Sequence, residues 1–361
     1  MRAGGWLVLG LLGSCGYRSV PTPVRPLEEL RLQPAQIGAL ADRLLEGEPR
    51  VVLIGESHYE AAQTRFATDL ILELAERGWV DVVVLEAPWS ESLVHAGVAE
   101  GEARPVRLTI DDNTALDRLH GHNQAHPDTS FRILSNDLEM GTAAQRRVLL
   151  MLERRGLEVS DASLQAVAGE GGPDGHLAAN ALATHEAFAA PDADFQRVRQ
   201  ERVIATLTDP ERNGGWLEEG EHVVFWLGSK HTRLGTPCDG VRFEGCVIED
   251  ELGLVARSVQ MRSASFTPGW MAAGGLEACE GTEITEWLSW EVLTRIDQGF
   301  ARRAYGNDLM NPDVSRHDLR RSRAFGEGPV LWLDPERASG HDAVVVFPST
   351  ELHQPLCTTG R

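Results

Sequence analysis

The sequence has little positive charge for its length. Its 361 residues include 34 Lys and Arg against 54 Asp and Glu, which gives a formal net charge of -20. No run of basic residues with interleaved aromatic residues occurs, and a chain this acidic repels a phosphate backbone. The composition therefore argues against nucleic acid as a partner. A hydrophobic content of 42% is enough for a substantial core in one large domain or two moderate ones.

Several catalytic signatures are also missing. The chain has no GxSxG nucleophile elbow, so Ser57 fits a small turn residue better than a nucleophile. It has no GxxxxGK(S/T) phosphate-binding loop, and its cysteines lack the paired CxxC spacing of a zinc site. Short-period repeats are absent as well, which excludes a solenoid.

The N-terminus has the pattern of an export signal. Arg2 precedes a short apolar stretch, residues 6–12, that is far too short to span a bilayer, and "LGSC" closes it at Cys15. This pattern resembles the lipobox of bacterial lipoproteins, in which the signal is cut before a cysteine that then carries lipid. The resemblance implies a signal peptide over residues 1–15, lipidation of Cys15, and a membrane-anchored protein of the bacterial cell envelope that faces the periplasm or the cell surface. An ordinary secretory signal is the alternative, and it also predicts export.

The rest of the chain divides into a tether and a folded part. Residues 16–26 contain three prolines and are expected to form an extended tether. Folded structure is expected over residues 27–361. The folded part holds four cysteines, an even number that is typical of disulfides in an oxidising compartment: Cys238, Cys246, Cys279 and Cys357. Cys238 and Cys246 flank "DGVRFEG", which favours a tight turn, so a local bridge between them comes first among the three possible pairings.

Alternating strand and helix patterns predict an α/β fold. Residues 51–54 are continuously apolar, residues 60–77 carry Phe66, Leu70 and Leu74 on one helical stripe ended by Gly78, and residues 82–85 are apolar again. This is a βαβ unit, which implies parallel strands. Further strands are expected at 131–134, at 223–227, in "PVLWL" and in "HDAVVVFP", with helices at 139–155, 176–207 and 284–304. We therefore expect a mostly parallel central sheet flanked by helices, loops at 170–176 and 211–221, and a candidate helical lid over residues 140–215.

Polar side chains follow several of the predicted strands. "VVLIGESH" ends in Glu56 and His58, "VVVLE" in Glu86, the strand at 131–134 leads to Asp137, and "VVFWLGSKH" ends in His231. In open α/β sheets, ligands bind beyond the carboxyl ends of the strands, so these residues are expected around one crevice. His58 is expected near a helix N-terminus, where an imidazole stays neutral and can act as a base or bind a metal. The simpler alternatives are a helix-capping role for His58 and a solvent-facing carboxylate at Glu86.

These motifs resemble a known superfamily. "IGESH", "VLEAPW" and "FWLGSKH" are similar to the superfamily that contains erythromycin-esterase-like hydrolases, ChaN-type haem-uptake lipoproteins and TIKI-type proteases. The likeness covers roughly residues 50–235, and "RQERVIATL" (199–207) resembles one of its helices. It implies a mostly parallel sheet and a site formed by Glu56, His58, Glu86 and His231. The spacing of glycine, two residues and histidine is closer to the ChaN and TIKI branches than to the esterases.

The resemblance and the strand-end residues together predict a hydrolase. His58, assisted by Glu86 or Glu56, would activate water against an ester, lactone or amide carbonyl, while His231 would bind the substrate or act as the acid. Four further side chains are expected to contact a small-molecule substrate: Arg65, Lys230, Asp137 and Trp89. Arg65 or Lys230 would stabilise developing negative charge, whereas Trp89 equally suits a packing role.

The cofactor stays open among none, a divalent metal ion and haem. A metal-assisted reaction would use His58, His231 and Glu86 as ligands. The alternative function is a non-enzymatic lipoprotein of the ChaN type that binds haem or a metal, although the chain beyond His231 is longer than such a module needs. The histidines of "HGHNQAH" (120–126) are expected on a connecting segment, exposed to solvent.

Overall fold

The computed structural model describes residues 33–57, 60–97, 110–235, 238, 240–263, 266–267, 329–333, 340–347 and 350–351. The following predictions lie outside these residues: the signal peptide with Cys15, the tether, His58, the helix at 284–304, Cys279 and Cys357.

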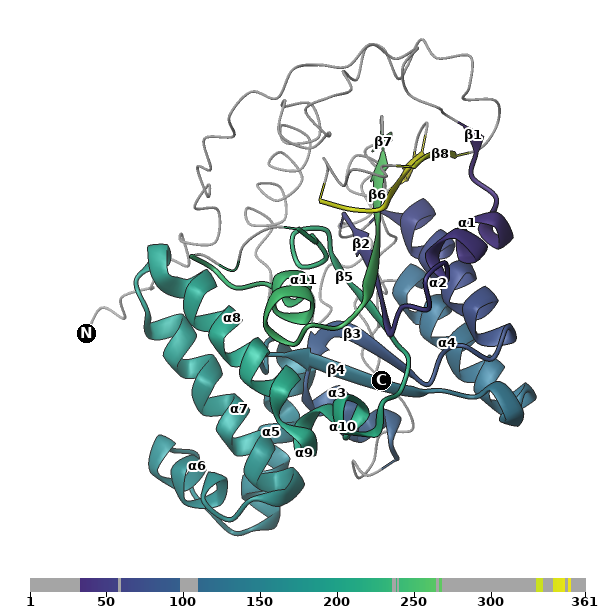
Figure 1. The fold of residues 1–361 in the computed structure, drawn as a ribbon. Helices are drawn as coiled ribbons and strands as arrows, with labels where there is room; N and C mark the ends of the chain where they lie inside the picture. Colours follow the sequence, from purple (N-terminus) through teal and green to yellow (C-terminus); the bar gives the residue numbers. More distant parts are fainter. Residues whose placement is uncertain are drawn as a thin grey trace.

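A mostly parallel β-sheet forms the centre of the structure (Figure 1). Six neighbouring strands are parallel, in the order β9 (Ala343–Phe347), β6 (Ala256–Ser263), β2 (Val51–Glu56), β5 (Val223–Gly228), β3 (Val82–Pro88) and β4 (Arg132–Asp137). At the β9 edge, β8 (Val330–Leu333) adds antiparallel and is followed by β1 (Gln33–Pro34). The short strands β7 (Phe266–Thr267) and β10 (Thr350–Glu351) pair separately. The predicted α/β class with a mostly parallel sheet is confirmed.

The central strands are apolar because helices cover both faces of the sheet. Every residue of β5 is at least partly buried, and β2 is buried from Val51 to Gly55, as expected for parallel strands. β6 was not predicted, because its sequence "ARSVQMRS" has no apolar run. Two of its polar side chains are nevertheless buried, Ser258 at 0% and Gln260 at 2% exposure, which a search for apolar runs does not detect.

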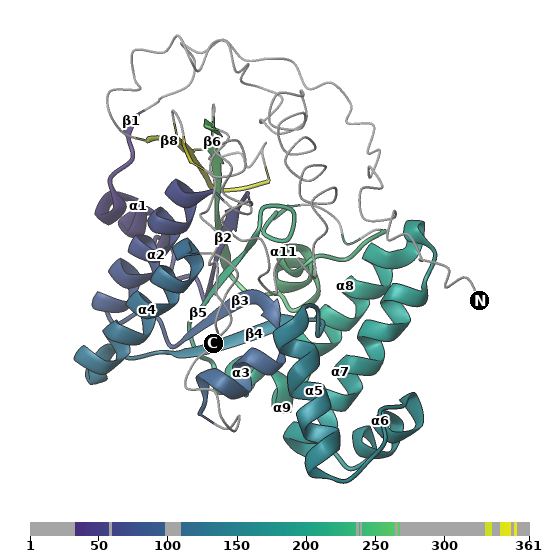
Figure 2. The ribbon, with the colours of Figure 1, turned by 180° about the vertical axis from the view of Figure 1, so that it is seen from behind.

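Three helices cover one face of the sheet: α1 (Ile37–Leu44), α2 (Ala61–Glu76) and α4 (Ile110–Ala125) (Figures 1 and 2). Leu70 and Leu74 of α2 belong to the same core cluster as Ile54 of β2. The helix ends before Gly78, whose φ of 69° lies in the left-handed region that glycine adopts without strain. Both the helical stripe and its end point are therefore as predicted.

The other face carries helices from the long segment between β4 and β5, followed by one short helix after β5. They are α5 (Thr142–Arg154), α6 (Asp161–Ala168), α7 (Gly172–Ala189), α8 (Asp192–Thr208), α9 (Pro210–Asn213), α10 (Trp216–Glu219) and α11 (Glu244–Cys246). Ile204 and Leu207 of α8 pack in one core cluster with Leu53 and Phe225 of the sheet. Figures 1 and 2 show α5 to α8 on the side of the sheet opposite α2. The described helices include none that is long and apolar enough to cross a membrane.

Some local predictions differ from the structure. The segment 170–176 is helical from Gly172, because Pro173 occupies the first helical turn, where its missing N–H is not needed. The single helix expected at 176–207 is two helices, α7 and α8, separated at Pro191. "HGHNQAH" is helical up to Ala125, and His122 within it is only 7% exposed, so its histidines are not all on an exposed connecting segment.

Candidate functional site

The polar residues after β2, β5, β3 and β4 lie along one edge of the sheet, because these four strands are parallel and adjacent in that order. Glu56 is paired in register with Gly228, and the last residues of β3 and β4 are paired as Pro88 with Asp137. Glu86 therefore stands between the end of β5 and the end of β4. This is the carboxyl edge at which open α/β sheets bind ligands.

The two glycine motifs pack against each other at this edge. A Cβ atom on Gly55 would lie 2.3 Å from Thr232 Oγ1 and 3.0 Å from Ser229 Cα, so β2 leaves room only for glycine beneath the turn that follows β5. The Ser229 N–H donates to the Glu56 carbonyl at 2.9 Å. Gly55 of the first motif thus leaves space for the turn of the second motif, and this turn carries His231.

Glu86 is held by a backbone amide and a guanidinium. Its Oε2 accepts from the Gly228 N–H at 2.7 Å, and its Oε1 accepts from Arg199 Nη2 at 2.7 Å. Arg199, on α8, also donates from Nε and Nη2 to the two carboxylate oxygens of Asp137, at 2.9 and 2.5 Å. Burial lowers the pKa of Arg199, but Asp137 and Glu86 outweigh it and leave that pKa raised. One partly buried cation thus forms ion pairs with two strand-end carboxylates.

His231 lies between two carboxylates. Its Nδ1 is 2.8 Å from Glu244 Oε2, and its Nε2 is 3.5 Å from Glu86 Oε1. The Gln200 side-chain amide lies 3.3 Å from Nδ1. Burial lowers the pKa of the imidazole, but Glu86 and Glu244 outweigh burial and raise the pKa above its ordinary value of 6.5. The site therefore favours the protonated ring, which carries an N–H at both nitrogens.

Glu56 belongs to a different part of the same edge. Its Oε2 accepts from the Trp226 indole N–H at 2.7 Å, and Trp226 packs against the core beneath α2. Glu86 and His231 instead meet Arg199 and Glu244, which belong to helices of the opposite face. Successive residues of a strand alternate between its two faces, which accounts for this separation of Glu56 from the cluster.

The other predicted substrate-binding residues differ in their surroundings. Asp137 is in the cluster through Arg199, as described above. Arg65 is 62% exposed on α2 and lies 3.8 Å from Asp111, and Lys230 is exposed next to His231. Trp89 is 3% exposed and its indole N–H donates to the Arg212 carbonyl at 3.1 Å, which favours its packing role.

Three members of the cluster were not singled out from the sequence: Arg199, Gln200 and Glu244. Arg199 and Gln200 are in the "RQERVIATL" helix that carries part of the superfamily resemblance, so that likeness was a usable signal. Glu244 follows His231 after 13 residues in a segment without a catalytic pattern. Only the folded structure shows that its carboxylate contacts the imidazole.

The described part of the cluster does not fit a metal ion. Within the residues that the structure describes, no three His, Cys, Asp or Glu side chains are grouped so as to hold one. The Glu86 Oε1 atom that faces His231 also accepts from Arg199, and the guanidinium charge disfavours a second cation there. His231 Nδ1 faces Glu244, so this nitrogen is not directed at an open ligand position. We therefore assign no metal to the pair His231 and Glu86 by itself; the predicted third ligand, His58, lies outside the described residues.

Comparison with known proteins supports the fold and no finer assignment. No family model matches the sequence, and no curated protein is significantly similar to it. A succinoglycan biosynthesis protein matches 90% of this chain and 95% of its own at TM-score 0.54 and 10% identity. A protein from Bacillus cereus matches 90% and 96% at TM-score 0.52 and 11% identity. An erythromycin esterase variant in its open conformation matches 88% and 98% at TM-score 0.47 and 12% identity. The first two matches show that the α/β fold of this chain occurs in other solved proteins.

Proposed function

We propose that the protein is an exported hydrolase that activates water against an ester, lactone or amide bond of a small-molecule substrate. The observation that carries the proposal is His231, buried at the carboxyl edge of the sheet and bracketed by Glu244 at 2.8 Å and Glu86 at 3.5 Å. Two flanking carboxylates favour an imidazolium, and an imidazolium is a proton donor. The role of acid, one of the two expected for His231, is therefore the better supported.

The proposed reaction is a direct attack by water. His58 removes a proton from the water as its oxygen adds to the substrate carbonyl carbon. The tetrahedral intermediate then expels the alcohol or amine, and His231 Nε2 gives its proton to that leaving group. One water is consumed, one acid and one alcohol or amine are formed, and the proton on His58 returns to His231 to complete the cycle.

The charged residues near the proposed site have different proposed roles. Arg199 is engaged by Asp137 and Glu86, so its role is to keep these carboxylates in place at a buried edge. Lys230, exposed beside His231, is the better candidate for stabilising the developing oxyanion. Arg65 is the weaker one, because Asp111 lies 3.8 Å from it. We also propose lipid anchoring in the cell envelope through Cys15, which the lipobox-like sequence supports.

A panel of activated esters, lactones and amides tests the hydrolase proposal. We expect His231→Asn and Glu86→Gln each to lower kcat/KM by at least about 100-fold, the usual contribution of a positioned acid or base. His185→Asn and Glu201→Gln are the matched controls, because these side chains are 58% and 52% exposed. Both controls should keep the activity of the wild type.

Two results would contradict the proposal. The first is no turnover of any ester, lactone or amide by the purified protein. The second is turnover that His231→Asn and Glu86→Gln leave unchanged, because the activity would then belong to another site or a contaminant. A Soret band that His231→Asn abolishes would instead support the alternative function, haem binding.

A further inference from the structure

Glu244 is a buried carboxylate with both oxygens engaged. Its Oε2 is 2.8 Å from His231 Nδ1, and its Oε1 accepts from Asn136 Nδ2 at 3.2 Å. The residue is 1% exposed. A carboxylate is costly to bury unless its charge is compensated, so its position beside the imidazole is specific. The bond at Nδ1 also fixes the ring plane and leaves Nε2 facing Glu86.

The backbone around Glu244 is fitted tightly to the turn that carries His231. The Gly245 N–H donates to the His231 carbonyl at 2.7 Å. A Cβ atom on Gly245 would lie 2.3 Å from the Arg233 carbonyl oxygen and 2.9 Å from its carbon. Only glycine permits this approach, and it sets the Glu244 side chain directly against the ring.

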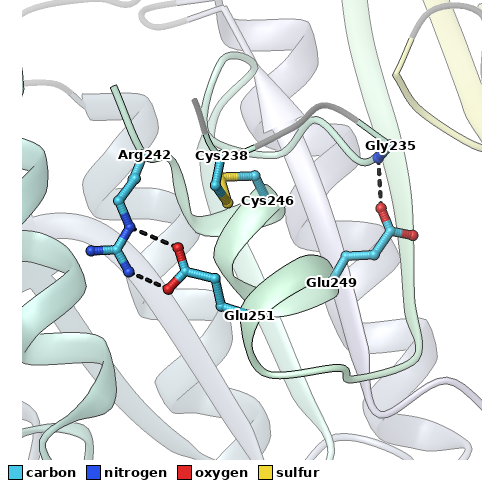
Figure 3. Close-up of a disulfide and its surroundings, with 6 residues drawn as sticks. All are labelled: Gly235, Cys238, Arg242, Cys246, Glu249 and Glu251. Atoms are coloured by element: carbon cyan, nitrogen blue, oxygen red, sulfur yellow. Dashed lines mark hydrogen bonds and ion pairs between the residues drawn. A yellow bond between two sulfur atoms is a disulfide. The ribbon is translucent and has the colours of Figure 1, made fainter. Parts of the chain in front are cut away.

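A disulfide holds the helix that carries Glu244. The structure joins Cys238 to Cys246 (Figure 3), the pairing that comes first from the sequence. Cys246 is the last residue of α11, a three-residue helix that begins at Glu244. A helix of this length has no stability of its own, so its position depends on the contacts that tie it to the rest of the chain.

Two polar contacts flank the disulfide on either side (Figure 3). Arg242 donates from Nε to Glu251 Oε1 at 2.8 Å, and the Gly235 N–H donates to Glu249 Oε2 at 2.6 Å. Both join the loop before α11 to the π-helical turn Val247–Glu251 after it. Because these contacts are exposed and individually weak, the disulfide adds a covalent restraint to the packing of Val247 and Ile248 in the core.

We propose that Glu244 is a positioning residue that orients His231 for proton transfer, and that the Cys238–Cys246 bridge keeps Glu244 in place. The proposal rests on the proposed function of His231. It adds that the oxidation state of the Cys238–Cys246 pair controls the proton transfer by His231. A dithiol supplies two electrons and two protons to the bridge, which leaves two cysteine thiols and the oxidised cyclic reagent. Once the bridge is cleaved, noncovalent contacts alone hold α11 and Glu244 beside the ring.

The first experiment compares Glu244→Gln with the wild type by NMR titration of the histidine ring nitrogens. His231→Asn identifies the His231 signals. We expect the pKa of His231 to fall in Glu244→Gln because one neighbouring negative charge is lost, and kcat to fall about 100-fold through misplacement of the ring, with little change in KM. Asp250→Asn is the matched control, since this carboxylate is exposed on the same segment.

The NMR measurement separates this proposal from the hydrolase proposal, because it requires no turnover. A His231 pKa that falls in Glu244→Gln, in a protein without hydrolase activity, supports the positioning role and overturns the hydrolase proposal. An unchanged His231 pKa and an unchanged pH profile in Glu244→Gln overturn the positioning role, whether or not the protein is a hydrolase.

A second variant tests the bridge and covers the case in which Glu244→Gln does not fold. Cys238→Ser combined with Cys246→Ser removes the bridge but leaves Glu244 unaltered. We expect a lower His231 pKa and a lower kcat in this variant, and the same changes when dithiothreitol reduces the wild type, with thiol formation followed by mass spectrometry. A wild-type His231 pKa and kcat in the double variant would overturn the assigned role of the bridge.

Discussion

Replacing Glu139 by glutamine should stabilise the protein above pH 7. Glu139 is 1% exposed and lies just beyond β4. Its Oε1 accepts from the Ser90 N–H at 3.0 Å and from Asn180 Nδ2 at 2.9 Å, and its Oε2 is 2.5 Å from Ser90 Oγ. A neutral carboxyl group could donate from Oε2 to Ser90 Oγ, and a glutamine amide could do the same while its oxygen keeps the other two bonds.

The magnitude follows from the pKa of Glu139. Burial raises that pKa from 4.5 to about 7, against the opposing hydrogen bonds of Ser90 and Asn180 and the charge of Arg147. Since the folded state holds the Glu139 proton more tightly than the unfolded state, the contribution of Glu139 to stability is highest below pH 4.5 and falls as the pH rises from 4.5 to about 7. At about 1.4 kcal/mol for each tenfold change in proton affinity, the loss is about 3 kcal/mol at pH 8 and under about 1 kcal/mol at pH 5.

Urea unfolding of the disulfide-intact protein, followed by tryptophan fluorescence at pH 5, 6, 7 and 8, measures this effect. Glu139→Gln should exceed the wild type by about 3 kcal/mol at pH 8, and the advantage should shrink toward pH 5. Glu158→Gln, on an exposed loop residue, controls for loss of a carboxylate at the surface. An advantage that does not depend on pH, or a variant less stable than the wild type at pH 8, would refute the reasoning.

Two further substitutions test the packing of the site. Gly55→Ala places a Cβ atom 2.3 Å from Thr232 Oγ1, so we expect a loss of about 1–3 kcal/mol in unfolding free energy together with lower activity. Gly38→Ala is the control and should be tolerated, because the nearest contacts of its added Cβ atom are at 3.7 Å. Equal stability of the two variants would contradict the proposed packing. Arg199→Met leaves the buried Asp137 and the partly buried Glu86 without their shared cation and should cost up to about 3–5 kcal/mol. Arg197→Met, on the exposed side of the same helix, should change the denaturation midpoint little. Similar midpoints for both variants would show that the Arg199 ion pairs contribute little.

The strands of the sheet could be predicted from the sequence where their buried positions hold apolar residues. Strands β2, β3 and β5 are covered on both faces and consist of apolar runs, so their positions and their parallel direction could be predicted. β6 could not be predicted in this way, because Ser258 is buried with its hydroxyl hydrogen-bonded to the Thr232 carbonyl at 2.6 Å. A buried polar side chain is stable when it has such a partner, and the partner is 26 residues away in the chain.

Part of the candidate site could be predicted from the sequence for the same reason. Glu86, Asp137 and His231 follow apolar strands, and parallel strands bring their carboxyl ends to one edge, so the sequence by itself determined that these residues lie at a common edge. It did not determine what they contact there. Arg199 and Glu244 come from helices whose approach to the edge depends on side-chain packing and on close backbone contacts such as that of Gly245 with Arg233. The charge of His231 and the face of the sheet on which it lies were therefore decided by the tertiary structure, because both depend on neighbours distant in the sequence.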